Sequence, residues 1–255
     1  MRLVIENVSK RFAGVHALRE VSLTAGDGRV VGIIGPNGSG KSTLFNVISG
    51  FLRADDGTVR LEDAAITSRA PHKIARAGLV RTFQVPHVAK RLTVMDNLMF
   101  GAPGHRNERV WSALLGRRRA DRFEQEATVE AFDVAETVGL APKADEYAGN
   151  LSGGQLKLLS LGMAMMARPQ VLLLDEPTAG VNPSLIGRLI DPVFERRPVG
   201  QTIVLIEHNM DLITSHCDEV YVLDAGRVIA HGTPDDVRRD ERVVQAYLGY
   251  EGAKT

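Results

Sequence analysis

The sequence has little cysteine and no net charge, and both absences exclude classes of protein. Cys217 is the single cysteine among 255 residues, so no intramolecular disulfide can form. Its place after an apolar run is typical of a partly buried thiol in a reducing compartment. Lys and Arg together number 31, which equals the 31 Asp and Glu. Without a basic field the chain is a poor candidate for binding nucleic acid, and without an acidic tail it gives no sign of a basic partner.

A long hydrophobic run is also missing. The longest weakly polar stretch, residues 156–167, contains Lys157 and Ser160. It is shorter than the roughly 18–20 apolar residues that a bilayer crossing requires. The N-terminus reaches Glu6 after only three apolar residues, which is not typical of a signal peptide. We therefore expect a cytosolic chain whose membrane connection comes through a partner.

The sequence does contain short apolar runs separated by helix signals. Four of them are rich in branched residues, as strands covered on both faces should be: 30–34, 79–83, 171–174 and 202–206. This alternation predicts an α/β fold with a largely parallel sheet flanked by helices. Near the C-terminus two further runs flank Ala225 and Gly226, which predicts an antiparallel hairpin.

The middle of the chain has a different pattern. No strand pattern occurs from about residue 104 to 149. Four residues there are spaced as one stripe of a helix: Ala127, Ala131, Val134 and Val138. Gly139 follows the stripe, where a left-handed C-terminal cap is favoured. We expect a single domain, residues 1–255, with a helical subdomain at approximately 85–165 inserted in its core.

The strongest motif is GPNGSGKST, directly after the first of these strands and before a helical run at 44–48. It comprises Gly35, Pro36, Asn37, Gly38, Ser39, Gly40, Lys41, Ser42 and Thr43. Its glycines let successive N–H groups converge on phosphate oxygens, and the following helix adds its positive end. Lys41 supplies charge at the β- and γ-phosphates, and Ser42 offers a hydroxyl to Mg²⁺. The motif therefore predicts a phosphate-binding P-loop rather than a glycine-rich turn that binds nothing.

The second motif is VLLLDEP, an apolar strand that ends in Asp175 and Glu176. Open α/β sheets bind their ligands at the carboxyl ends of strands. Asp175 can hold Mg²⁺ directly or through water, and Glu176 can orient or deprotonate the water that attacks the γ-phosphate. An isolated Asp-Glu pair is more often a helix cap or a loop pair. The P-loop upstream favours the catalytic interpretation.

The third motif is LSGGQ, residues 151–155, at the start of a long helical stretch. Ser152 is a good N-cap, but Gly153 and Gly154 each weaken a helix by roughly 1 kcal/mol relative to alanine. Bare backbone at a helix N-terminus suits the close approach of an anion. One nucleotide does not need two phosphate surfaces from the same chain. We therefore predict a dimer with nucleotide at the interface.

The order of these motifs, followed by a strand that leads to His208, resembles the ABC (ATP-binding cassette) ATPase family along nearly the whole chain. The resemblance implies a P-loop NTPase core with a mostly parallel sheet, an N-terminal antiparallel β-subdomain and an inserted helical subdomain. It implies ATP and Mg²⁺ as cofactors. It also implies two subunits closed head to tail, so that Ser152 and Gly154 of one face the P-loop of the other.

Three further roles come from the resemblance alone. Phe12 resembles the aromatic residue that stacks on adenine, Gln84 the glutamine that senses Mg²⁺ and contacts the transmembrane partner, and His208 the histidine that contacts the γ-phosphate. The plain alternatives are a core phenylalanine, a strand-capping glutamine and an ordinary loop histidine. The complete predicted site has Glu176, His208, Gln84 and Lys41 as catalytic residues, Ser42, Gln84 and Asp175 as Mg²⁺ ligands, and Phe12, the P-loop residues, Ser152, Gly153, Gly154 and Gln155 as nucleotide contacts.

A closer resemblance is to the ATPases of bacterial branched-chain amino acid uptake, particularly their longer subunit. It is carried by RTFQ with LTVMDNL, by AGVNP, by IEHNMDLI and by HGTPDDV leading to AYLG. It implies import of a small amphipathic solute by a homodimer, or a heterodimer with a sister ATPase, bound to permease subunits on the inner face of the membrane. A periplasmic solute-binding protein would take part indirectly, and no nucleic acid is expected.

Alternatives within the family stay open, because a cassette does not encode the direction of transport. They are an exporter ATPase of the lipopolysaccharide type, a soluble ABC protein acting in translation or DNA repair, and a regulator that binds nucleotide without turnover. Two departures from the family pattern are Asn182, where many members carry aspartate, and Pro192, which we expect to kink or end its helix. Residues 85–100 are expected to transmit motion to a permease.

Overall fold

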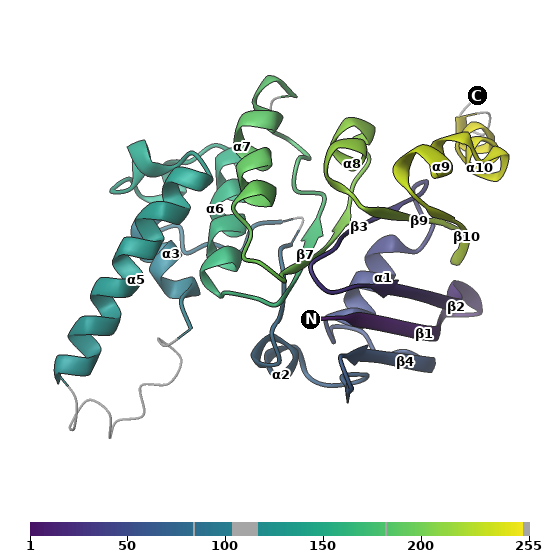
Figure 1. Cartoon of the computed structure of the whole chain (residues 1–255), viewed down its shortest axis with the longest axis horizontal. Coiled ribbons are helices and arrows are strands. Elements are labelled where there is room, and N and C mark those ends of the chain that lie inside the picture. Colours follow the sequence, from purple (N-terminus) through teal and green to yellow (C-terminus); the bar gives the residue numbers. More distant parts are fainter. Residues whose placement is uncertain (84, 104–116, 182, 252–255) are drawn as a thin grey trace. The chain divides into compact units, whose positions relative to one another are not determined.

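The computed structural model describes the chain except for Gln84, residues 104–116, Asn182 and residues 252–255 (Figure 1). It consists of two compact units. The first unit comprises Met1–Arg81, Gln170–Glu176 and Pro198–Thr255. The second comprises Thr82–Pro169 and Pro177–Arg197.

The first unit contains a six-stranded sheet in the order β10-β9-β3-β8-β7-β6. Its strands are β3 (Val30–Ile34), β6 (Leu79–Arg81), β7 (Val171–Asp175), β8 (Thr202–Ile206), β9 (Glu219–Asp224) and β10 (Arg227–Gly232). All neighbours pair in parallel except β9 and β10, which form an antiparallel hairpin. Every residue of β3, β7 and β8 is buried, as their apolar sequences predict. The predicted α/β fold with a mostly parallel sheet is confirmed. The run at 79–83 is a shorter strand than expected, ending at Arg81.

A second sheet in this unit is antiparallel and has the order β2-β1-β4-β5. Its strands are β1 (Leu3–Phe12), β2 (Val15–Ala25), β4 (Asp56–Leu61) and β5 (Ala64–Ala65). Figure 1 shows β1, β2 and β4 side by side near the N-terminus. This is the N-terminal antiparallel β-subdomain that the resemblance implied.

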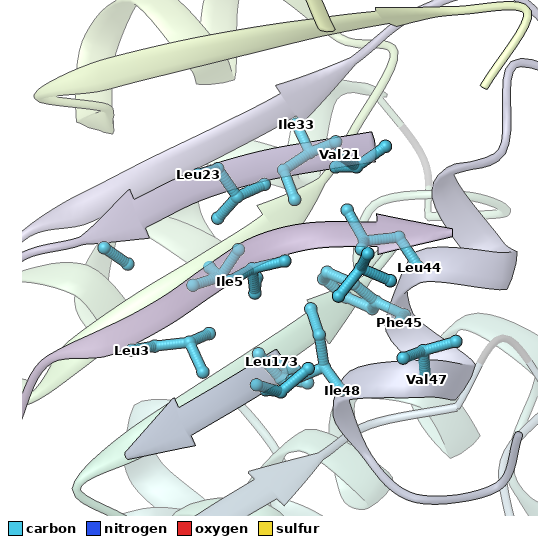
Figure 2. Close-up of a cluster of buried hydrophobic side chains, with 14 of the residues drawn as sticks. Leu3, Ile5, Val21, Leu23, Ile33, Leu44, Phe45, Val47, Ile48 and Leu173 are labelled. Carbon is cyan, nitrogen blue, oxygen red and sulfur yellow. The ribbon is translucent and has the colours of Figure 1, made fainter. Parts of the chain in front are cut away.

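The core of the first unit forms around α1 (Lys41–Ile48), the helix that follows the P-loop. Figure 2 shows Leu44, Phe45 and Ile48 of this helix gathered with apolar side chains of β1, β2, β3 and β7. These three side chains are completely buried. Burial of each stabilises the fold by about 1.5–3 kcal/mol, so the core holds the helix in place and fixes its N-terminal end beside the P-loop.

In the described part of the first unit, the other helices are α2 (Pro71–Arg76), α8 (Met210–His216), α9 (Pro234–Arg239) and α10 (Glu241–Glu251). Asn209 caps α8, because its side chain accepts hydrogen bonds from the N–H groups of Asp211 and Leu212. Ala225 and Gly226 form the predicted hairpin turn, with φ angles of 42° and 80°. Both values are typical of a tight two-residue turn between antiparallel strands.

The second unit is helical, with α3 (Val94–Gly101), α5 (Arg117–Thr137), α6 (Gly153–Met166), α7 (Pro183–Glu195) and the short turns Ala141–Lys143 and Ala148–Asn150. The four residues of the predicted stripe are buried: Ala127, Ala131 and Val134 on α5, and Val138 directly after its end. Gly162 lets α6 pack closely, because a Cβ added there would lie 2.7 Å from Cδ2 of Leu98 on α3 and 3.1 Å from Cγ1 of Val134 on α5. Gly139 ends this stretch with a φ of 68°, the predicted left-handed cap.

Pro192 was expected to kink or end its helix, and it does not end it. Helix α7 continues past it to Glu195, and the N–H of Arg196 still donates to the carbonyl of Pro192 at 2.9 Å. Proline removes one backbone donor but leaves its own carbonyl available to the next turn, so the helix can continue beyond it. In the part of the chain that the structure describes, no helix is both long and apolar enough to cross a membrane.

Candidate nucleotide-binding site

The P-loop connects β3 to α1, and two of its glycines press directly against neighbouring backbone. A Cβ added at Gly40 would lie 2.6 Å from the carbonyl oxygen of Ala17. One added at Gly35 would collide with the carbonyl oxygen of Leu223. Their φ angles of 107° and 147° also favour glycine. The loop therefore needs glycine at these positions for both its conformation and its packing.

Lys41 is buried inside this loop at the first turn of α1. Its Nζ donates to the carbonyl oxygens of Gly35 at 2.7 Å and Pro36 at 2.9 Å, and lies 3.4 Å from Oγ of Ser39. Burial lowers the pKa of Lys41, and the negative charges of Glu176 and Asp175 oppose that shift. The ammonium is thus held by oxygens of the loop and interacts electrostatically with the acidic pair at the end of β7.

The other P-loop side chains differ in accessibility. Ser39 is completely buried, and the amide of Gly226 donates to its carbonyl at 3.0 Å. Asn37, Gly38 and Ser42 are exposed, and a Cβ added at Gly38 would meet no atom within 4 Å. The tip of the loop and the hydroxyl at the start of α1 are therefore open to a ligand, while the base of the loop is packed.

Asp175 and Glu176 lie at the carboxyl end of β7 in different environments. Asp175 is 7 % exposed and its Oδ2 accepts a hydrogen bond from Nη2 of Arg81 at 2.7 Å. Glu176 has a φ of 48°, an unusual value for a non-glycine residue, and its N–H donates to the carbonyl of Ile206 at 3.0 Å. Such strain persists where the surrounding structure holds it, and it occurs often at active sites.

His208 approaches Glu176 from the end of β8. Its Nε2 lies 3.4 Å from Oε1 of Glu176. The buried carboxylate of Glu207 accepts hydrogen bonds from the backbone N–H groups of His208 at 2.9 Å and Asn209 at 3.2 Å. Glu207 therefore fixes the backbone that carries the histidine, a role that sequence reasoning missed.

The LSGGQ motif lies in the second unit at the start of α6. Ser152 is the N-cap, as predicted, and its Oγ accepts from the N–H of Gln155 at 3.3 Å. Oε1 of Gln155 accepts from the N–H of Ser152 at 3.0 Å, which closes a capping box. A Cβ added at Gly153 would meet no atom within 4 Å, whereas one at Gly154 would lie 3.2 Å from the carbonyl oxygen of Gly180. The first turn of α6 therefore leaves Gly153 open and packs Gly154 beside the loop before α7.

The remaining predicted residues have mixed outcomes. Phe12, at the end of β1, is 47 % exposed and lies 5.7 Å from Nζ of Lys10, so the alternative of a core phenylalanine is wrong. Thr43 is half-buried and Pro36 is buried. Gln84 and the departure at Asn182 lie outside the described residues. The first unit brings Lys41, Asp175, Glu176 and His208 together, and the second unit carries the signature motif.

A phosphate-binding loop between a buried strand and a helix, with an acidic pair on a nearby parallel strand, defines a P-loop nucleotide-binding protein. The family described as "ABC transporter" matches residues 18–179. The family described as "Branched-chain amino acid ATP-binding cassette transporter" matches residues 227–253.

Individual relatives agree with these families over nearly their full lengths. The chain is 40% identical to a probable branched-chain amino acid transport ATP-binding protein, LivG, of Archaeoglobus fulgidus, covering 99% of this chain and 97% of the relative. It is 38% identical to the high-affinity branched-chain amino acid transport ATP-binding protein BraF of Pseudomonas aeruginosa, covering 97% of each. A crystal structure of a nucleotide-free ATP-binding cassette from an ABC transporter superposes with a TM-score of 0.81 at 40% identity, covering 97% of this chain and 99% of that one.

The chain therefore belongs to the ABC transporter family, as a member of its group of branched-chain amino acid transport ATP-binding proteins. Like the cassettes of that family it binds and hydrolyses ATP to drive transport.

Proposed function

We propose that this chain hydrolyses MgATP as one half of a cassette dimer on the inner face of a membrane, and so powers import of branched-chain or related amino acids. The observation that carries the proposal is the constellation at the carboxyl ends of β7 and β8, where Glu176 and His208 lie 3.4 Å apart in the same unit as the P-loop lysine. The solute class is supported by the names of the relatives, which are branched-chain amino acid transport proteins.

The P-loop would bind the nucleotide by exchanging hydrogen bonds within the loop for hydrogen bonds to phosphate oxygens. Lys41 Nζ bonds to loop carbonyls, and it would transfer these bonds to oxygens of the β- and γ-phosphates. The exposed backbone around Gly38 and the N-terminal end of α1 would supply further donors. The exposed ring of Phe12 offers a stacking surface for adenine.

Mg²⁺ fits the donors that this unit provides. The Ser42 hydroxyl is exposed at the start of α1, and Asp175 presents a carboxylate at the end of β7. Mg²⁺ is commonly held by one or two protein oxygens together with substrate phosphates and water. When bound, Mg²⁺ neutralises charge that develops on the phosphates. Gln84 is proposed as a third ligand on the resemblance alone.

Glu176 is proposed to orient or deprotonate the attacking water. Its backbone is held by Ile206, and its side chain is within reach of His208, so the carboxylate has a defined place. His208 would contact the γ-phosphate while Glu207 holds its backbone. General base catalysis of this kind contributes about a hundred- to ten-thousand-fold in rate.

The signature helix is proposed to complete the nucleotide site of a second subunit. Ser152 and Gln155 close the capping box, and Gly153 is open, so backbone N–H groups in the first turn of α6 are accessible to an anion. Whether the second subunit is another copy or a sister ATPase does not change this geometry.

The segment after Gln84 is proposed to contact a permease. Val85 is 70% exposed, while Val88, Leu92 and Met95 are half-buried. Asn97 shapes this segment, because its completely buried side chain accepts from the N–H of Ala89 at 2.8 Å and donates to the carbonyls of Ala89 and Thr93 at 3.1 and 2.8 Å. A loop held in this way that exposes the apolar side chain of Val85 suits docking to a membrane partner.

The catalytic assignment is tested with Glu176→Gln. This variant should bind ATP, lose hydrolysis by about a hundredfold or more, and accumulate as an ATP-bound dimer in size-exclusion chromatography. Adding Gly153→Asp should abolish the dimer without unfolding α6, because the position is open and a carboxylate there would repel a partner's phosphates. Gly153→Ala is the matched control. Full turnover in Glu176→Gln would remove this residue from the mechanism.

The solute is tested with the assembled transporter in proteoliposomes. Leucine, isoleucine and valine, presented with the binding protein, should stimulate ATP turnover more than urea, short amides or aromatic acids. Stimulation by none of the amino acids would refute the import of branched-chain solutes, and the ATPase assignment would be unaffected.

A further inference from the structure

Arg81 is a buried cation at the end of β6, the edge strand that pairs with β7. Its side chain is only 7% exposed, equal to that of its ion-pair partner Asp175. Arginine is almost never so buried unless its charge is compensated.

The guanidinium joins two parts of the nucleotide site. Nη2 donates to Oδ2 of Asp175 at 2.7 Å. Nη1 donates to Oδ1 of Asn46 at 2.7 Å and to Oγ of Ser49 at 3.1 Å. Its central carbon lies 5.5 Å from the ring centre of Phe45. Phe45 and Asn46 belong to α1 and Ser49 is its C-cap, so one side chain links the acidic end of β7 to the P-loop helix.

Asn46 and the C-cap residue Ser49 lie on the face of α1 that also carries Ser42. Residues 42, 46 and 49 are separated by four and then three positions, which places them in one row along an α-helix. Arg81 therefore binds the helix one and two turns beyond the serine and binds the aspartate directly. One guanidinium thus links Asp175 to the helix that carries Ser42, and both residues are proposed Mg²⁺ ligands.

We propose that Arg81 is a positioning residue for Mg²⁺: it holds one oxygen of Asp175 and fixes that carboxylate relative to the α1 face that presents Ser42. The inference rests on the proposed Mg²⁺ site and extends it. A planar guanidinium suits the task because its donors point in fixed directions and can serve a carboxylate and two helix groups together. The lysine ammonium would keep the charge but not this geometry.

The test compares binding of a fluorescent ADP analogue in excess Mg²⁺ and in EDTA. The dissociation constant in EDTA divided by that in Mg²⁺ measures how much Mg²⁺ strengthens binding, and no ATP hydrolysis is involved. In Arg81→Met this ratio should fall by about 10- to 100-fold, the range usual for losing a partner that orients a metal ligand, while binding in EDTA stays unchanged. Arg81→Lys should recover part of the ratio.

Arg29→Met is the matched control. It removes another Arg–Asp ion pair of the same unit, in which Arg29 lies 3.3 Å from Asp218 and is about half exposed. It should leave the ratio at the wild-type value. If Arg81→Met weakens binding equally in Mg²⁺ and in EDTA, or strengthens the Mg²⁺ contribution, Arg81 does not position the ligand and the inference is wrong.

Asn46→Ala keeps the buried ion pair and removes one anchor on α1, so it serves if Arg81→Met does not fold. Its ratio should fall by a smaller factor than that of Arg81→Met, and an unchanged ratio would overturn the link to the helix. A wild-type protein that shows no Mg²⁺ effect would refute the proposed Mg²⁺ site itself, which is a different outcome from a variant-specific change.

Discussion

Replacing Asn97 by alanine removes the side chain that holds the chain between Ala89 and Thr93. The amide makes four hydrogen bonds, to the N–H of Ala89 and to the carbonyls of Ala89, Leu92 and Thr93. The bond to Leu92 is long, at 3.4 Å, and contributes little. Each of the others contributes a net 0.5–1.5 kcal/mol, so we expect a loss of about 2–4 kcal/mol in unfolding free energy.

The assay is urea unfolding followed by circular dichroism, with Asn150→Ala as a control at an exposed position of the same unit. In the assembled transporter, Asn97→Ala should also lower the solute moved per ATP, because the docking segment loses its shape. A stability loss below about 1 kcal/mol would refute the claim that this amide organises the segment, since three good buried hydrogen bonds should cost more.

Two further predictions concern the first unit. Gly40→Ala should weaken ATP binding at least about tenfold, because the added Cβ would lie 2.6 Å from the Ala17 carbonyl and the φ of 107° is strained for alanine by about 1–3 kcal/mol. Titration with a fluorescent ATP analogue measures this affinity. Gly200→Ala is the control, because Gly200 also has a positive φ but a Cβ added there would meet no atom within 4 Å. Equal ATP affinities of the Gly40→Ala variant and the wild type would contradict the prediction. Burial, aided by the charge of Asp218, raises the pKa of the Cys217 thiol from 9.0 to about 12. The folded thiol keeps its proton in the range where the unfolded thiol ionises, so stability should fall as pH rises from 9 toward about 12 and Cys217→Ala should lack that slope.

The local motifs were predictable because each is contiguous in the chain. The P-loop, the acidic pair and the Ser152 cap can each be recognised from a few consecutive residues, and all three have the expected backbone placement. The hairpin at Ala225 and the cap at Gly139 were predictable for the same reason. The roles of the site residues stay predictions.

The partners of these motifs could not be predicted, because they meet only through the fold. Arg81 and Asp175 are 94 positions apart and come together because β6 pairs with β7. An arginine in an otherwise apolar run was a usable signal, since such a charge must find a partner when its strand is buried. Glu207 gave no comparable signal, because its contacts depend on a local backbone turn that points the N–H groups of His208 and Asn209 at its carboxylate.

The place of Cys217 beneath β3 makes the natural protein a ready background for site-specific labelling. The thiol is buried, and a Cβ built on Gly32 would lie 3.1 Å from its Sγ, so maleimide reagents should react with it far more slowly than with an exposed thiol. A cysteine introduced at an open position such as Gly153 would then be labelled first. Spectroscopic probes could follow the approach of two subunits during a transport cycle without removal of the native thiol.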